Sequence, residues 1–272
     1  MTFGLATVGN DAVLVRDDRF VPLTHWGERR DLHGLLADWD AALPQMHRWA
    51  ADEAAFASAL GLADADVRAP YRPGQVFCTG ANYKKHVVGL VMGDPSMRNA
   101  EAEAMSEDER RRRVEEMMDA RANADPYCFI KLPSCVVGPR DAVVLPRNVA
   151  KPDWELELGV VIGKRTRHIT AERAMIVPRQ FVADPYDLTI TLSVNGKVYQ
   201  NESTRDMMVS IERQIAYLSD RVELMPGDVI CTGSPYGNGS AFGVFLQPGD
   251  EMEGSITGLG TQRNRCVAEG AG

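Results

Sequence analysis

The stretch Pro152-Asp153-Trp154-Glu155-Leu156-Glu157-Leu158-Gly159-Val160-Val161-Ile162-Gly163 alternates acidic and apolar residues, and a β-branched run and a glycine follow. This pattern predicts a β-strand, in which alternate side chains share a face. Glu155 and Glu157 then point the same way, with Asp153 behind them. The three apolar side chains between and beside them point into a core.

Two neighbouring carboxylates on one face repel each other, so they stay ionised together only when water surrounds them or a cation bridges them. Oxygen ligands of this kind suit a hard ion such as Mg²⁺, Mn²⁺ or Ca²⁺. A half-exposed strand that carries two solvated acids explains the pattern equally well. The Glu-x-Glu pair alone therefore leaves both interpretations open.

The composition is that of an ordinary globular protein. The chain has 272 residues, of which 44% are hydrophobic and 25% charged, and its formal net charge is −8. The negative charge argues against a nucleic-acid partner and gives no reason to expect binding to an anionic membrane. No apolar run reaches membrane-spanning length, and no signal peptide is recognisable. The five cysteines are scattered without C-x-x-C pairs, which predicts reduced thiols, a cytoplasmic location and no zinc site.

Residues 1–70 are predicted to form a small separate domain, and the turn-rich segment 69–74 is the predicted boundary with residues 71–272. Short strands are expected early in the small domain, followed by helix over 32–60 that breaks near Pro44. Its three histidines, at positions 25, 33 and 47, are interpreted as surface or packing residues.

The segment 76–86 predicts a buried strand, a glycine turn and a helix start, with Asn82 as the helix N-cap. His86 would lie in the first helical turn, where it could act as a general base near neutral pH. A plain surface histidine is the alternative. Further on, Ser106 and Glu109 form a capping box for a helix over 107–121, whose four consecutive arginines either face solvent or bind an anion.

Lys131 and Ser134 follow a predicted strand, but no histidine stands in a serine-hydrolase arrangement with Ser134. The Asn195-Gly196 pair predicts a β-hairpin, and a helix is expected over 207–218. Glycines in the loop after Thr232 lack the Gly-Lys-Ser/Thr of a phosphate loop, so a nucleotide site is not supported. The overall pattern is mainly β with some α-helix, an α+β class.

Six motifs occur in an order that resembles the fumarylacetoacetate hydrolase superfamily over residues 70–268. They are Gly80-x-Asn82-Tyr83-x-x-His86, Lys131-x-Pro133-Ser134, Glu155-Leu156-Glu157-Leu158, Val194-Asn195-Gly196, Ile215-Ala216-Tyr217-Leu218-Ser219, and Pro226-Gly227-Asp228 with Thr232-Gly233-Ser234-Pro235. The resemblance implies a mixed β-sandwich roll with a small N-terminal domain, usually assembled as a homodimer. It also implies a Mg²⁺ or similar ion held by Glu-x-Glu and a later aspartate, which chelates a 2-oxo acid or β-diketone.

On this resemblance we expect a metal-dependent hydrolase or lyase that cleaves carbon–carbon bonds of small 2,4-dioxo acids. Glu155 and Glu157 would bind Mg²⁺, Mn²⁺ or Ca²⁺, and His86 would be the base. The substrate contacts would come from four residues: Tyr83, Lys131, Gly233 and Ser234. A decarboxylase, hydratase or isomerase of the same superfamily, or a catalytically inactive paralogue with a structural or regulatory role, are the alternatives.

Two departures from the family pattern bear on this expectation. Many relatives carry a glutamate three residues after the histidine, where this chain has Gly89. A segment that holds a third acidic ligand also has no counterpart after Met175, and Asp184 and Asp187 belong by register to the following turn. Either the chain lacks the segment and has a weakened metal site, or a loop has been omitted from the sequence. The Met-Ile-Val-Pro junction has no turn residues, which favours the second explanation.

Overall fold

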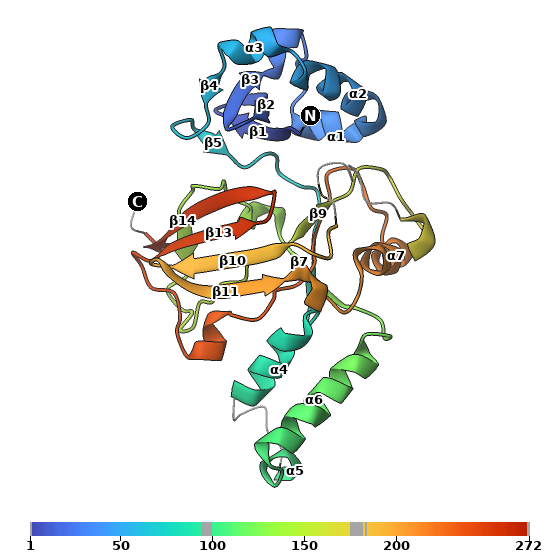
Figure 1. The fold of residues 1–272 in the computed structure, drawn as a ribbon, viewed down its shortest axis with the longest axis vertical. Coiled ribbons are helices and arrows are strands. Elements are labelled where there is room, and N and C mark those ends of the chain that lie inside the picture. Colours follow the sequence, from blue (N-terminus) through green and yellow to red (C-terminus); the bar gives the residue numbers. More distant parts are fainter. Residues whose placement is uncertain (1, 94–99, 175–181, 183, 271–272) are drawn as a thin grey trace.

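The computed structural model describes residues 2–93, 100–174, 182 and 184–270. Three β-sheets account for the strands, and the chain runs from a small N-terminal unit through two central sheets (Figure 1). Helices α4 and α6 project from the end opposite to the N-terminal unit (Figure 1). Among the described helices, none has the length and apolar character needed to cross a bilayer.

The N-terminal sheet and its core are built from the first 71 residues. Its strand order is β4-β3-β2-β1-β5, with β1 (Gly4–Val8), β2 (Asp11–Arg16), β3 (Arg19–Pro22), β4 (Leu60–Gly61) and β5 (Val67–Arg68). Helices α1 (Leu32–Ala37), α2 (Trp39–Ala50) and α3 (Glu53–Ala57) contribute to the same hydrophobic cluster. Because this sheet and its hydrophobic cluster use only the first 71 residues, they support the predicted domain boundary near residue 70, which stays a prediction.

The expected helix break at Pro44 is wrong, because Pro44 lies inside α2. The helical region is divided instead at Asp38, whose φ of −129° and ψ of 43° are not helical, and again before α3. The side chain of Asp52 accepts a hydrogen bond from the backbone of Ala55 and so starts α3. A proline removes only one hydrogen bond of a helix, whereas the capping carboxylate of Asp52 stabilises a new helix start at α3.

The second sheet has the order β11-β10-β13-β14-β8. Its strands are β8 (Val143–Leu145), β10 (Thr189–Val194), β11 (Lys197–Ser203), β13 (Glu251–Ile256) and β14 (Gly260–Ala268). The predicted hairpin is confirmed between β10 and β11. Asn195 and Gly196 have φ angles of 51° and 78°, the left-handed values that a two-residue turn of this kind needs.

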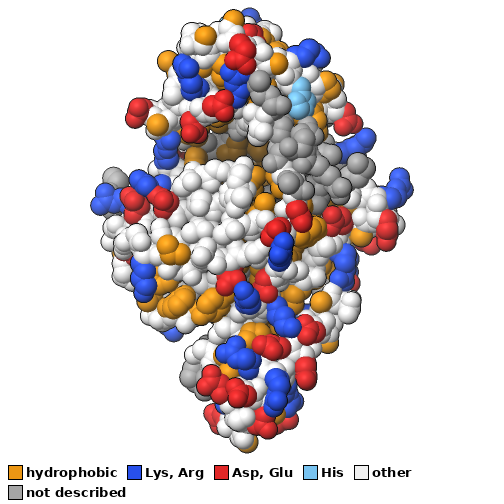
Figure 2. All heavy atoms as spheres, viewed as in Figure 1, with side chains coloured by type: hydrophobic (Ala, Val, Ile, Leu, Met, Phe, Trp, Pro, Cys, Tyr) orange, Lys and Arg blue, Asp and Glu red, His pale blue; other side chains and the backbone are white. Residues whose placement is uncertain are grey.

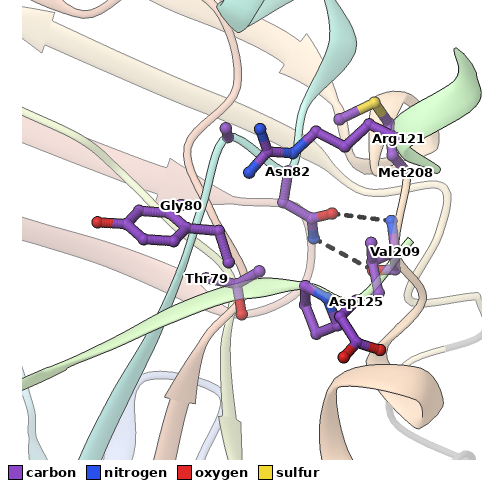
Figure 3. Close-up of a pocket in the computed structure, with 10 residues that line it drawn as sticks. Thr79, Gly80, Asn82, Arg121, Asp125, Met208 and Val209 are labelled. Carbon is purple, nitrogen blue, oxygen red and sulfur yellow. Dashed lines mark hydrogen bonds between the residues drawn. The ribbon is translucent and has the colours of Figure 1, made fainter. Parts of the chain in front are cut away.

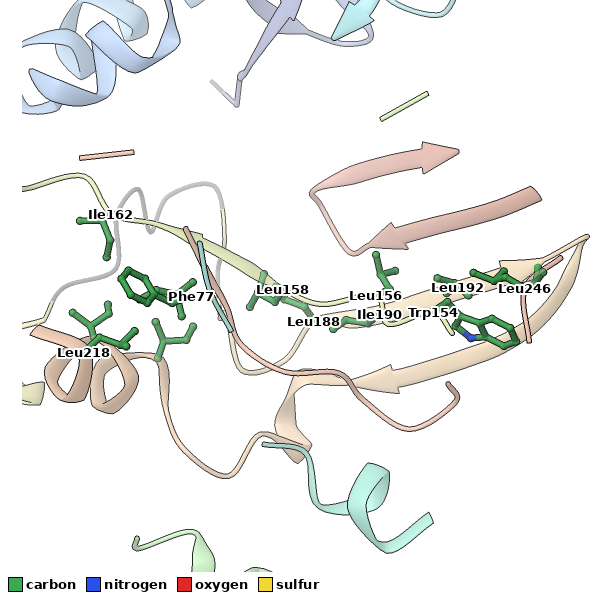
Figure 4. Packing of buried hydrophobic residues seen from close by; sticks show 14 of the residues in the cluster. Phe77, Trp154, Leu156, Leu158, Ile162, Leu188, Ile190, Leu192, Leu218 and Leu246 are labelled. Carbon is green, nitrogen blue, oxygen red and sulfur yellow. The ribbon is translucent and has the colours of Figure 1, made fainter. Parts of the chain in front are cut away.

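The third sheet has the order β7-β6-β12-β9, in which β6 and β12 are parallel. Its strands are β6 (Val76–Gly80), β7 (Tyr127–Lys131), β9 (Gly159–Val161) and β12 (Val229–Cys231). The main hydrophobic core lies among the second sheet, the third sheet and helix α7 (Ile211–Arg221), as Figure 4 shows. Helix α7 begins at Ile211, four residues after the expected start at 207, and its N-cap Ser210 accepts a hydrogen bond from the backbone of Arg213.

The predicted strand over 152–163 is only partly correct. Strand pairing is limited to β9, and residues 152–158 have no ladder partner. The alternation nevertheless holds, because Trp154, Leu156 and Leu158 are buried in the main core (Figure 4). Side-chain bonds help to hold this segment. Leu156 N donates to Gln200 Oε1, and the Asp153 carboxylate accepts from Gly239 N and Ser240 N at the start of η6 (Gly239–Phe242).

The projecting arm consists of α4 (Lys84–Gly93), α5 (Ala100–Glu103) and α6 (Glu107–Arg121). The predicted capping box of Ser106 and Glu109 is confirmed. Arg110 donates to carbonyls of Ala102 and Met105, and acidic and basic side chains are interspersed over the arm (Figure 2). These contacts agree with a solvated helix face, while anion binding by the arginine run stays untested.

The remaining helical turns are 3₁₀-helices. They are η1 (Leu23–Trp26), η3 (Pro133–Cys135), η4 (Ala171–Arg173), η5 (Thr204–Asp206) and η6 (Gly239–Phe242). The predicted short helix after Thr170 is thus a single turn, and its expected end at Met175 lies outside the described residues.

Candidate metal and active site

Glu155 and Glu157 face a cavity of about 410 Å³ between the third sheet and the hairpin of β13 and β14. The wall on the side of the third sheet includes Lys131 and Cys231. The hairpin contributes residues from 254 to 262, and Pro139 and Leu156 also line the cavity. A volume of this size is typical of a site for a small molecule.

The two carboxylates are poorly compensated within the chain. Burial raises the pKa of Glu157 to about 8, and the Cys231 thiol and the Glu155 carboxylate act in the same direction. Burial also raises the pKa of Glu155, although the Lys131 ammonium opposes this. A divalent cation would offset the energetic cost of holding both carboxylates ionised in this place.

The loop after β12 holds one of these carboxylates in position. Gly233 N donates to Glu157 Oε2 over 2.6 Å. Gly233 has a φ of +106°, and a Cβ there would lie 2.9 Å from both Asn82 Cβ and Thr79 O. Only glycine therefore allows the loop to pass this close and to aim its N–H at the carboxylate.

His86 lies beside the carboxylate pair on α4 and is only 5% exposed. Its Nε2 is 3.6 Å from Glu155 Oε1, and its Nδ1 is buried without a hydrogen-bond partner among the described residues. Burial lowers the His86 pKa, against a smaller opposing effect of Asp153. The imidazole is therefore favoured in its neutral form, in which one ring nitrogen can accept a proton.

Comparison with known proteins adds a family to this geometry. The family model described as "Fumarylacetoacetate (FAA) hydrolase C-terminal" matches residues 75–177 and 174–267, well over half of the chain. The chain belongs to the fumarylacetoacetate hydrolase family. The two matches meet at the Met175 junction that the sequence analysis singled out, and that junction lies outside the described residues.

Similar proteins include enzymes with different reactions. The human mitochondrial oxaloacetate tautomerase FAHD2A is 32% identical over 72% of this chain and 67% of its own length. The 2,4-didehydro-3-deoxy-L-rhamnonate hydrolase of Sphingomonas sp. is 27% identical over 86% of this chain and 90% of its own. A solved maleylpyruvate hydrolase from Sphingobium sp. SYK-6, in complex with manganese(II) and pyruvate, shares the fold. Its TM-score is 0.69, with 22% identity over 98% of this chain and 99% of that one.

The donor set of this family member fits a hard divalent ion in part. Glu155 and Glu157 supply carboxylate oxygens, but the described residues contain no cluster of three or more His, Cys, Asp or Glu that could hold a metal. Asp184 accepts from the backbone of Tyr186, and Asp187 pairs with Arg205 at 2.6 Å. Both aspartates thus stabilise the turn before β10, where the sequence analysis placed them.

The predicted N-cap role of Asn82 is wrong. Its side-chain amide is 2% exposed, donates to the carbonyls of Val209 and Thr232, and accepts from Val209 N. Figure 3 shows the two bonds to Val209, beside a cavity of only about 10 Å³. At the start of α4, Lys85 N donates to Asp206 Oδ2 instead. The acceptor comes from a distant segment, which local sequence cannot reveal.

The four predicted substrate contacts have different surroundings. Lys131 lines the cavity. Burial lowers the pKa of its ammonium group, but the surrounding acidic groups, of which Cys78 has the largest effect, raise the pKa overall. Gly233 reaches the site through its bond to Glu157. Ser234 is buried, and its hydroxyl accepts a hydrogen bond from Gln200 Nε2. Tyr83 is also buried, and its backbone forms an isolated antiparallel β-bridge with Met207. All four stay predictions as substrate contacts.

Sequence reasoning missed Cys231 and Tyr236. Cys231 lines the cavity, and its place before the Thr232-Gly233 loop was the available signal. The Tyr236 ring occupies the space beside Gly89: a Cβ on Gly89 would lie 2.4 Å from Tyr236 Cε2. The ring therefore occupies the space that a side chain at position 89, three residues after His86, would need.

Replacing Gly89 by alanine is expected to lower the stability by about 1–2 kcal/mol, because the overpacking cost exceeds the gain in helix propensity. The Tyr236 ring cannot retreat freely, since it packs against Phe242 with ring centroids 5.9 Å apart. Thermal unfolding measures the effect. Gly93→Ala is the matched control, because a Cβ there meets nothing within 4 Å. A Tyr236→Ala background that fails to relieve the Gly89→Ala loss would contradict the prediction.

Proposed function

We propose that this family member is a divalent-metal-dependent enzyme that hydrolyses a carbon–carbon bond of a small 2,4-dioxo acid. The observation that carries the proposal is the pair Glu155 and Glu157, whose pKa values are raised by burial and which face a cavity of about 410 Å³ together with Lys131. An anionic oxo acid would be repelled by two bare carboxylates. A bound cation removes that repulsion and gives the acid two oxygen-binding sites.

The residues of the chain divide the chemistry among them. The ion, when bound by Glu155 and Glu157, supplies positive charge that stabilises negative charge developing on a substrate oxygen. Lys131 offers an ammonium to the substrate carboxylate in the same cavity. The neutral imidazole of His86 takes a proton from a water molecule that attacks the neighbouring carbonyl. The Gly233 N–H keeps Glu157 oriented throughout.

Similar proteins support the proposed substrate class and suggest a second candidate function. The solved relative with manganese(II) and pyruvate is named a maleylpyruvate hydrolase, which supports a divalent ion and a 2-oxo acid. Another relative is named an oxaloacetate tautomerase, and tautomerisation of a 2-oxo acid needs the same stabilised enolate oxygen without cleavage. Oxaloacetate tautomerisation is therefore the alternative function. A homodimer remains a further expectation.

A substrate panel tests the proposal. The metal-free protein is assayed with acylpyruvates and with enol-oxaloacetate, before and after addition of Mg²⁺, Mn²⁺ or Ca²⁺. Metal-dependent loss of the acylpyruvate absorbance supports the hydrolase, and tautomerisation alone supports the second candidate. Isothermal titration with Mg²⁺ and oxalate separates both from an inactive paralogue, since a working site binds the two together.

The affinity for Mg²⁺ is expected to rise about tenfold per pH unit from pH 6 to pH 8 and to level off above that, because the metal competes with the proton on Glu157. The sign follows from the raised pKa of about 8, below which the carboxyl is mainly protonated. Titration calorimetry in two buffers of different ionisation enthalpy measures both affinity and proton release. A flat affinity between pH 6 and pH 8 would refute this prediction.

A further inference from the structure

Cys78 and Cys231 lie side by side in the floor of the third sheet. Cys78 is central in β6, Cys231 ends the parallel strand β12, and the two residues are direct partners in the strand register. Partners in register point to the same face of a sheet. The register therefore places the two thiols on neighbouring strands and on the same face of the sheet.

The two thiols differ in access. Cys231 is partly exposed and lines the cavity beside Glu155 and Glu157. Cys78 is 1% exposed and lies behind it. A small reagent that enters the cavity therefore meets Cys231 first, and Cys78 stands beside it on the neighbouring strand to react with the product.

The backbone geometry allows a bond between them. Neighbouring strands lie about 4.8 Å apart, close to the lower end of the Cα separations of about 4.4–6.8 Å that disulfides span. Cys231 is the last residue of β12, so the small adjustment that the bond needs falls on the loop that follows. Gly233 in that loop holds Glu157 through its N–H.

We propose that Cys78 and Cys231 form a redox-sensitive dithiol in the wall of the cavity, which hydroperoxides oxidise to an intramolecular disulfide. A hydroperoxide ROOH transfers one oxygen to the Cys231 sulfur, giving a sulfenic acid and ROH. The Cys78 thiol then attacks that sulfur, the S–S bond forms and water leaves. Both thiols together lose two electrons, which reduce the O–O bond of the peroxide.

The disulfide is expected to reduce turnover several-fold, a consequence that rests on the proposed function. It removes the Cys231 thiol from the cavity wall and shifts the loop that orients Glu157. A reductant such as dithiothreitol restores the two thiols and the turnover, because a bond formed across neighbouring strands is strained and readily reduced.

Peptide mapping by mass spectrometry tests the site without an activity assay. The reduced full-length protein is treated with hydrogen peroxide, alkylated and digested, and a Cys78–Cys231 linked peptide with loss of two free thiols is expected. In Cys78→Ser the Cys231 sulfenic acid persists and is trapped by dimedone, whereas Cys231→Ser forms no link. Cys128→Ser is the matched control and keeps the link, because Cys128 lies against Thr79, which points to the opposite face.

Three results would overturn the proposal: a Cys231 that stays reduced in the folded protein, a Cys78 that links to Cys135 instead, or equal sulfenic acid trapping in wild type and Cys78→Ser. If the Cys78–Cys231 disulfide forms but the reduced protein turns over no oxo acid, the proposed function is refuted and the redox-sensitive dithiol is still supported. A link that leaves an established turnover unchanged would remove the regulatory consequence.

Discussion

Glu157→Gln is expected to lower the Mg²⁺ affinity at least about a hundredfold, because even loss of an outer-shell partner of a metal typically costs 10–100-fold. Turnover of the oxo-acid substrate should fall with it. Glutamine keeps a side-chain oxygen for the Gly233 N–H, which is 2.6 Å from Glu157 Oε2, so the loop is not released. Titration calorimetry and steady-state kinetics measure the two losses.

Stability separates this effect from misfolding. The folded-state pKa of Glu157, about 8, lies above its ordinary value of 4.5, so the metal-free protein loses stability as the pH rises from about 4.5 to about 8, and this loss is complete above 8. Glutamine has no charge to lose, so the variant should melt no lower than the wild type at pH 9. Lower melting there would mean that the fold, not the metal site, had been damaged.

Glu223→Gln is the matched control for the Glu155→Gln variant. The side chains of Glu155 and Glu223 are both 43% exposed, but Glu223 pairs with Arg165 away from the cavity. The Glu223→Gln variant should therefore keep the metal affinity and turnover of the wild type, whereas Glu155→Gln should lower both. Wild-type metal binding in Glu155→Gln and Glu157→Gln alike would refute the metal assignment.

Asn82→Ala is expected to reduce the free energy of unfolding by about 3 kcal/mol, since it leaves several buried backbone groups without a partner. The amide joins Val209, just before α7, to Thr232 at the end of β12. The same residue stands between the Gly233 loop and the helix that carries His86. Turnover should therefore fall together with stability, and denaturant titration and kinetics measure the two.

Asn201→Ala is the control for this variant. Asn201 is exposed in β11, where its side chain accepts a single hydrogen bond from Thr191. A loss within about 0.5 kcal/mol is expected there, as for ordinary surface positions. If Asn82→Ala proved equally mild, the tie between α4, α7 and the Gly233 loop would not be a structural requirement.

Local patterns predicted the features that depend on local energetics. The Asn195-Gly196 turn, the Ser106–Glu109 capping box and the alternate burial from Trp154 to Leu158 are all present. Each depends on residues within a few positions of one another, so neighbours in the chain determine the outcome. The family could likewise be identified from motif order alone.

The mistaken N-cap at Asn82 and the surroundings of Gly89 have a different cause. Asn82 bonds to Val209 and Thr232, and the start of α4 uses Asp206, so the caps came from segments more than a hundred residues away. The side chain of Tyr236 fills the space beside Gly89. None of these partners is visible from local propensity, because packing between distant segments decides which polar groups can meet.

By itself, the sequence determined that two acidic side chains stand on one face of a largely β-structured chain, with a histidine and a lysine elsewhere in the motif order. Spacing along the backbone suffices for that, since alternate residues of an extended segment share a side. Only the tertiary structure decided that Glu155, Glu157, Lys131 and Cys231 surround one cavity and that burial raises the pKa of both glutamates. Desolvation arises when distant strands close over a group, and no stretch of sequence contains it.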